Sequence, residues 1–288
     1  MRVLKFGSSR GIGLTSQETE LLLAYHAVLG DRLLALSGEK EQFAGLFHRL
    51  GSAGVAHCVI EGMDDHRDLG RSIAELAAVC DRFEPTVVAV NTNWQLLMAA
   101  VARRRTARRF LIVYTVHGFR HNSPVKQLVF RFLIGAGLWL FADRIIAPTR
   151  FVAGKFSALR GRISCIPLGE EDSLFEASRP PDLTKPLSFL FAGEFRRGKN
   201  QDVVVRAFAR FVAEAPEADA SLYLPGAGEL LDTVRALARD LGVADRVHFP
   251  GHVARAEIVR LYQRCQCAIV PTNVETFGHC IAEPMVMR

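Results

Sequence analysis

The sequence predicts an α/β protein with two Rossmann-like, doubly wound domains that face a cleft, the second of them incomplete. Two observations favour this fold. Short apolar runs alternate with segments of helical spacing, which is the pattern of a parallel sheet covered by helices on both faces. The alternation stops in an acidic and then proline-rich stretch before Pro186 and begins again after it, so each series predicts a domain of its own.

The first series of elements occupies residues 1–168. Strands are expected where short apolar runs occur, at Val3–Phe6, Arg32–Leu36, Val55–Ile60, Thr86–Val90, Phe110–Thr115, Arg144–Ala147 and Ile163–Pro167. Helices are expected between them, at Gln17–Leu29, Phe43–Leu50, Leu69–Arg82, Trp94–Arg104, Val125–Phe141 and Arg150–Leu159. In the first of these helices, Leu21, Leu22, Tyr25 and Leu29 recur at the spacing of one helical face.

Residues 169–186 are expected to form a linker, and residues 187–288 the second domain. Its strands are predicted at Leu187–Ala192, Ser221–Leu224, Arg246–Phe249 and Ala268–Pro271. Its helices are predicted at Gln201–Ala213, Leu230–Leu241 and Arg255–Arg264. Doubly wound domains usually have about five or six strands, so the last part of this domain is expected to be missing from the sequence.

The final stretch, Val270 to Met285, is expected to hold a ligand. It predicts a buried strand ending at Pro271, a short loop, and a helix that carries Glu275 and Glu283 on one face. A helix start near Thr276 to His279 would point free backbone amides at the space that the carboxylates border, which suits an anionic, hydroxyl-rich ligand such as a nucleotide-sugar. On spacing alone a solvated helix face is the better interpretation, but the preceding strand and the F-G turn favour a site.

The segment G-S-S-R-G-I-G, from Gly7 to Gly13, matches the glycine loop of short-chain dehydrogenases. That chemistry also needs a tyrosine with a lysine four residues later. The residues four positions after the four tyrosines are Leu29, Gly118, Ala227 and Gln266. The loop therefore indicates only a backbone that comes close to a phosphate or to a helix.

Charge and cysteine content limit the class of protein further. The net charge of +6 belongs to the part before residue 181, because Lys+Arg and Asp+Glu are equal in number after it. The six cysteines include no C-x-x-C pair, which favours reduced thiols in the cytoplasm over disulfides or a zinc site. The segment M-R-V-L-K-F-G-S is too short an apolar run for a signal peptide, so we expect a first strand there.

Several segments resemble family 4 glycosyltransferases. In the second domain these are L-F-A-G-E-F-R-R-G-K-N-Q, P-G-A-G-E-L, D-R-V-H-F-P-G-H-V and E-T-F-G-H-C-I-A-E. In the first domain Y-T-V-H-G-F-R, A-D-R-I-I-A-P-T-R-F-V and I-P-L-G-E-E-D-S-L-F resemble the same enzymes, especially those of bacterial exopolysaccharide and lipopolysaccharide assembly. The resemblance implies a GT-B fold and retaining transfer of a sugar from a UDP- or GDP-type donor, with no cofactor and no bound metal.

The resemblance also implies roles for residues of the second domain. Glu283 would hold the donor ribose, Glu275 would contact the sugar hydroxyls, and Lys199 would bind the diphosphate. Backbone amides near the sugar and phosphate would come from Phe277, Gly278 and His279. Glu194 stands where the family commonly has an arginine, so the second cation would be Arg196 or Arg197.

In the first domain the resemblance implies that His117 borders the donor sugar and that Gly11 and Gly13 face the diphosphate. On the residues alone, His117 is as readily a buried structural histidine, and the arginines of the second domain are as readily a solvated loop. Trp94 and Trp139 are expected to be packing residues.

Five arginines between Arg103 and Arg109 precede an eleven-residue apolar run, Phe132 to Ala142. The arginines predict a solvated helix end, since no recognition module for nucleic acid accompanies them. The apolar run is too short to span a bilayer, and it predicts either a buried crossover helix or attachment to anionic lipid. The second interpretation would place the protein at the inner face of the cytoplasmic membrane, next to a lipid-linked acceptor.

The predicted function is therefore transfer of a sugar to a cell-envelope saccharide or a lipid-linked acceptor. Two alternatives stay open. A UDP-sugar epimerase shares the architecture, and a non-catalytic nucleotide-sugar-binding subunit would need only part of the site.

Overall fold

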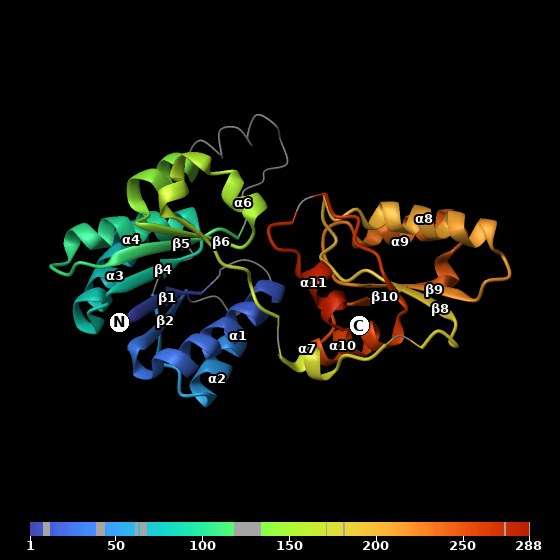
Figure 1. Ribbon diagram of the computed structural model, residues 1–288, viewed down its shortest axis with the longest axis horizontal. Helices are drawn as coiled ribbons and strands as arrows, with labels where there is room; N and C mark the ends of the chain where they lie inside the picture. The colour runs from blue at the N-terminus through green and yellow to red at the C-terminus, as the bar shows by residue number, and fades with distance from the viewer. Residues whose placement is uncertain are drawn as a thin grey trace. The chain divides into compact units, whose positions relative to one another are not determined.

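The computed structural model describes residues 1–7, 12–38, 44–60, 63, 68–117, 134–170, 172–180, 182–273 and 275–287. The chain divides into two compact units, Met1–Pro167 and Leu168–Arg288 (Figure 1). The segment 169–186, expected as a linker, contains helix α7 (Asp172–Glu176). Leu174 of this helix is fully buried in a cluster of the second unit, so that part of the segment packs with the second unit.

The first unit contains a seven-stranded parallel sheet with the order β3-β2-β1-β4-β5-β6-β7. Its strands are β1 (Val3–Phe6), β2 (Leu33–Ser37), β3 (His57–Val59), β4 (Val87–Val90), β5 (Leu111–Thr115), β6 (Arg144–Ala147) and β7 (Ile163–Cys165). The strand order reverses between β1 and β4, which is the point where doubly wound sheets commonly bind ligands.

Helices cover both faces of this sheet. They are α1 (Ile12–Leu29), α2 (Ala44–Ser52), α3 (Leu69–Phe83), α4 (Asn93–Arg105) and α6 (Arg150–Gly154). Figure 1 shows α1 and α2 on one face and α3 and α4 on the other. The predicted helix Arg150–Leu159 is shorter, because a 3-10 turn follows α6 over Ser157–Arg162.

The predicted helix Val125–Phe141 lies partly outside the described residues. Residues 134–141 are helical, and Ile134, Leu138 and Ala142 are buried on one side of this segment. Trp139 and Leu140 are 60% and 58% exposed, so the expectation that Trp139 is a packing residue is wrong. Within the described ranges, no helix has the length and apolar character needed to cross a membrane.

The arginine-rich end of α4 is held by carboxylates of neighbouring segments. Arg103 lies 2.5 Å from Asp143, and Arg108 forms an ion pair with Glu84. These pairs fit the predicted solvated helix end.

The second unit contains a four-stranded parallel sheet with the order β10-β9-β8-β11. Its strands are β8 (Leu187–Leu190), β9 (Ala220–Pro225), β10 (Val247–Gly251) and β11 (Cys267–Ala268). Its longer helices are α8 (Gln201–Glu214), α9 (Leu231–Asp240), α10 (Arg255–Arg264) and α11 (His279–Val286). The two parallel sheets confirm the predicted fold class. β11 is shorter and less buried than the predicted strand Ala268–Pro271.

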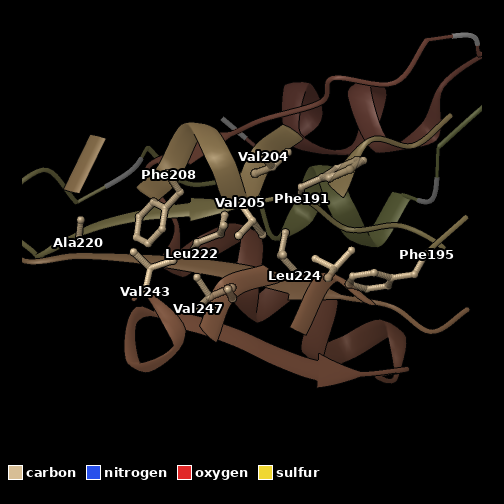
Figure 2. Close-up of a cluster of buried hydrophobic side chains, with 12 residues drawn as sticks. Phe191, Phe195, Val204, Val205, Phe208, Ala220, Leu222, Leu224, Val243 and Val247 are labelled. Atoms are coloured by element: carbon tan, nitrogen blue, oxygen red, sulfur yellow. The ribbon is translucent and has the colours of Figure 1, made fainter. Parts of the chain in front are cut away.

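Two apolar clusters lie on the two faces of the second sheet. One joins α8 and α9 to the strands, and Figure 2 shows Val205 and Phe208 of α8 close to Leu222 of β9. The other joins Leu174 of α7 and Leu261 of α10 to the opposite face. The alternation of side chains along β8 and β9 produces this division, since neighbouring residues of a strand point to opposite faces.

Candidate active site

The loop that follows β8 is held against the end of β9 by backbone hydrogen bonds. Gly193 N–H donates to the Pro225 carbonyl (3.0 Å), and Phe195 N–H donates to the Ala227 carbonyl (2.9 Å). Phe195 is fully buried and anchors the loop from its middle. The loop therefore presents the residues that follow Phe195 from a fixed backbone.

Two glycines permit this close approach. A Cβ atom on Gly226 would lie 2.0 Å from the Gly193 carbonyl oxygen, and one on Gly228 would lie 2.5 Å from the Phe195 carbonyl oxygen. The φ angles of Gly226 and Gly228 are +146° and +147°, which residues with a side chain rarely adopt. The P-G-A-G segment is thus required by the β8 loop that it supports.

Lys199 and Glu275 meet at the carboxyl ends of β8 and β11. Lys199 Nζ lies 2.5 Å from Glu275 Oε1, and the two side chains are only 12% and 20% exposed. The thiol of Cys280 lies 3.9 Å from the same nitrogen. Burial raises the pKa of Cys280 to about 11, while the charge of Lys199 lowers it. The thiol is therefore neutral beside this ion pair.

The loops that carry these two residues are joined directly. Asn273 N–H and the Thr272 hydroxyl both donate to the Gly198 carbonyl (3.0 and 3.2 Å). Asn200 Nδ2 donates to the Pro271 carbonyl (2.6 Å). Since β8 and β11 are neighbours where the strand order of this sheet reverses, the sheet topology brings the pair together.

Helix α11 begins at His279, after Gly278 at its N-cap with a φ of 88°. The start agrees with the predicted range, but the prediction that this helix carries Glu275 is wrong. Glu275 lies in the loop before the helix and packs against Gly278, where an added Cβ would lie 3.3 Å from the Cβ of Glu275. The backbone amides of the first turn therefore start next to the Lys199 pair.

The side chain of His279 turns to Glu170. His279 Nδ1 lies 2.7 Å from Glu170 Oε1, whose side chain is 7% exposed. The ring of Phe277 lies edge-on at 5.0 Å from the imidazole. Sequence reasoning missed Glu170, because it lies in a segment that was expected to be a linker.

Glu283 is buried between two residues of α10. Arg255 lies 2.5 Å from Glu283 Oε1, and the Tyr262 hydroxyl donates to Oε2 (3.0 Å). Burial and then the negative charge of Glu283 raise the pKa of Tyr262 far above its usual range. Both carboxylate oxygens thus hold α11 against α10, and this structural role was not predicted.

Arg196 and Arg197 lie in the β8 loop but are exposed. Arg196 Nε lies 3.1 Å from Glu194 Oε2. Glu194, where the resemblance implies an arginine, therefore binds Arg196.

In the first unit His117 follows β5, and its Nε2 lies 3.3 Å from Asn91 Oδ1. Gly13 lies in the first turn of α1, and Gly11 lies outside the described residues. Asn91 and Lys5, which also join this group, were not predicted. The signal that could have found Lys5 is a lysine within the apolar strand V-L-K-F.

Comparison with known proteins identifies the family of the chain. A model described as Glycosyltransferase Family 4 matches residues 35–171, and a model described as Glycosyl transferases group 1 matches residues 175–288. The first match covers most of the first unit, and the second covers nearly all of the second unit.

Curated relatives match part of the chain, among them two D-inositol 3-phosphate glycosyltransferases. A D-inositol 3-phosphate glycosyltransferase of Acidothermus cellulolyticus is 31% identical over an alignment of 158 residues, and the match covers 48% of this chain and 35% of the relative. A protein of the same name from Nocardiopsis dassonvillei is 30% identical over an alignment of 155 residues, and the match covers 48% of this chain and 36% of the relative. The chain thus spans little more than a third of these relatives.

Solved structures match the whole chain at low identity. The Anabaena protein HepE in complex with UDP and glucose has a TM-score of 0.77 and 18% identity, covering 100% of this chain and 78% of HepE. The lipopolysaccharide outer core galactosyltransferase WaaB has a TM-score of 0.71 and 15% identity, covering 100% of this chain and 78% of WaaB. These likenesses and the two parallel sheets define the chain as a protein of the GT-B fold.

The family follows from the two model matches taken with this fold. The chain belongs to the family 4 or group 1 glycosyltransferases, because the family 4 model matches its first unit and the group 1 model its second. The resemblance found in the sequence is therefore confirmed.

Proposed function

We propose that this protein is a retaining glycosyltransferase that moves a sugar from a UDP- or GDP-type donor to a cell-envelope saccharide or a lipid-linked acceptor. The observation that carries the proposal is the Lys199–Glu275 pair, held at the reversal of strand order and next to the start of α11. Such a position suits the diphosphate and sugar of a nucleotide-sugar.

The chemistry of this proposal concerns the leaving diphosphate. As the bond to the sugar breaks, negative charge gathers on the diphosphate, and a fixed cation lowers the energy of that state. Lys199 Nζ lies 3.9 Å from the thiol of Cys280 in the first turn of α11, and Arg196 and Arg197 are exposed on the same loop as Lys199. When a diphosphate binds Lys199, the Glu275 carboxylate becomes available to accept hydrogen bonds from sugar hydroxyls.

The roles of the remaining donor-binding residues are part of the proposal. Each oxygen of Glu283 has a second lone pair beyond its bond to Arg255 or Tyr262, and these can accept from ribose hydroxyls. His117 is proposed to contact the donor sugar and Gly13 to lie near the diphosphate. HepE, a protein of the same fold, was solved with UDP-glucose, which supports a donor of this class.

We also propose that the first unit attaches to anionic lipid at the inner face of the cytoplasmic membrane. Trp139 and Leu140 are exposed apolar residues on one helical segment. Arg144 and Arg162 follow in the chain, and Arg162 bonds the carbonyl of Trp139. Apolar side chains next to arginines suit a membrane surface.

Release of nucleotide from a panel of UDP- and GDP-sugars tests the enzymatic proposal. We expect one donor to be hydrolysed slowly, and Lys199→Ala to abolish this turnover at temperatures where the variant is still folded, although loss of the buried pair with Glu275 should lower its unfolding midpoint. Lys185→Ala is the matched control, because Lys185 pairs with Asp182 at 3.4 Å but is 65% exposed and lies before β8. Binding of a donor without turnover would instead indicate the non-catalytic subunit, and equal losses of stability and activity in Lys199→Ala would remove its catalytic role.

A further inference from the structure

A buried polar network lies at the carboxyl ends of β1 and β4, where the strand order of the first sheet reverses. Lys5 of β1 is 2% exposed, and its ammonium donates to Asn91 Oδ1 at 2.8 Å and to the Phe6 carbonyl at 3.3 Å. Asn91 directly follows β4 and is 5% exposed. A lysine is rarely buried so completely unless its charge is paired with a polar partner.

The amide of Asn91 has one orientation in this network. Its Nδ2 donates to the Phe6 carbonyl at 2.8 Å, and a carbonyl can only accept. Its Oδ1 faces the Lys5 ammonium, which can only donate. Gln95 fixes the backbone of the same residue, because its Oε1 accepts from Asn91 N–H at 2.8 Å while its Nε2 donates to the Gly7 carbonyl at 3.0 Å. If the amide were flipped, its NH₂ group would face the Lys5 ammonium and its oxygen would face the Phe6 carbonyl, and neither pair could form a hydrogen bond.

This orientation determines which nitrogen of His117 carries hydrogen. His117 Nε2 lies 3.3 Å from Asn91 Oδ1, and an amide oxygen only accepts, so Nε2 donates. In a neutral imidazole Nδ1 is then an acceptor. The Lys5 ammonium donates to the same oxygen, so Lys5 and His117 share Asn91 Oδ1 as their acceptor.

We propose that Lys5 and Asn91 are positioning residues that hold His117 with its hydrogen on Nε2, so that Nδ1 accepts a hydrogen bond from a hydroxyl of the donor sugar. The inference rests on the proposed function, since it takes His117 to contact the donor. It adds two residues to the site and states the chemical group that His117 recognises.

Nitrogen NMR of the imidazoles tests the positioning without any need for turnover. Long-range proton–nitrogen spectra distinguish the two neutral tautomers, and His117→Asn identifies the signals of His117. We expect the Nε2–H tautomer in the unaltered chain and a mixture of tautomers in Asn91→Leu. A hydrogen on Nδ1 in the unaltered chain, or the same His117 signals in Asn91→Leu, would overturn the proposal. Should Asn91→Leu fail to fold, Asn91→Ala removes the same acceptor oxygen with a smaller side chain and should give the same mixture.

Donor hydrolysis then tests whether the network acts through His117. We expect His117→Ala and Asn91→Leu each to lower kcat/KM about tenfold, and the double variant to lower it no further, as for residues that act as a unit. Ser72→Ala, which removes a buried hydroxyl bonded to the Asp68 carbonyl on α3, is the control and should keep full turnover. If the losses in kcat/KM of the two single variants add up in the double variant, the proposal is wrong. Absence of turnover in the unaltered chain would count against the proposed function, while the NMR result would still decide the positioning.

Discussion

Replacement of Arg255 by leucine should destabilise the second unit through Glu283. The side chain of Glu283 is 10% exposed, and its carboxylate is held by Arg255 at 2.5 Å and by Tyr262 at 3.0 Å. Removing one partner of a buried ion pair costs about 3–5 kcal/mol, because the other charge stays buried. The side chain of Arg255 is 31% exposed, so water reaches the pair, and we expect a loss of about 2 kcal/mol in the free energy of unfolding.

The two units can be followed separately in a urea titration. Trp94 and Trp139 are the two tryptophans of the chain, and both lie in the first unit. Tryptophan fluorescence therefore reports the first unit, while far-UV circular dichroism reports both. We expect Arg255→Leu to move the transition seen by dichroism alone.

A matched control lies on the same helix. Arg260 pairs with Glu257 at 3.0 Å, but its side chain is 73% exposed, so Arg260→Leu should change the free energy by no more than about 0.5 kcal/mol. The double variant Arg255→Leu, Glu283→Leu should regain part of the lost stability, since no buried charge remains. Equal effects of Arg255→Leu and Arg260→Leu would refute the reasoning.

Three further predictions follow from the described contacts. Gly228→Ala should weaken donor binding and cost about 1–3 kcal/mol of stability, because its Cβ would lie 2.5 Å from the Phe195 carbonyl, whereas Gly242→Ala has the strained backbone without the clash and should leave donor binding unchanged. Alkylation of Cys280 at pH 8 should be far slower than that of the exposed Cys165 and should rise as the pH approaches 11, because a pKa of about 11 leaves about one thiolate in a thousand at pH 8; equal rates in a mass-spectrometric time course would contradict this. Trp139→Ser should reduce flotation with anionic vesicles relative to the unaltered chain, with Phe175→Ser, an exposed residue of the second unit, as control; equal binding of anionic and neutral vesicles by the unaltered chain would refute attachment to anionic lipid.

The fold could be predicted from the sequence because most strands of both sheets are short apolar runs between amphipathic helices. The strand Val3–Phe6 and the helix Arg255–Arg264 have the predicted bounds. The last strand was predicted too long. β11 ends at Ala268, and although Ile269 N–H still donates to the Leu190 carbonyl of β8, the Pro271 carbonyl accepts from the side chain of Asn200 in a loop. An apolar run does not reveal where pairing ends.

The site was harder to predict, because its contacts join residues far apart in the chain. The E-x7-E spacing suggested that Glu275 and Glu283 share one helix, but Gly278 in a left-handed conformation starts the helix after Glu275. The two carboxylates then bind different cations, Lys199 and Arg255, and no spacing shows which cation lies near which acid. Asn91 and Lys5 meet because β1 and β4 are neighbours, and that neighbour relation is a property of the sheet topology.

The loops that carry Lys199 and Glu275 are bonded to each other, and this has a consequence for how the family can acquire new substrates. Lys199, Glu275 and the glycines that support the β8 loop all lie on one continuous segment with its own apolar core. A single recombination event on either side of that segment would carry the proposed donor contacts into another relative as one cassette. The part of donor preference that the second unit sets could then be inherited independently, while the sugar contact proposed for His117 would come from the relative's first unit.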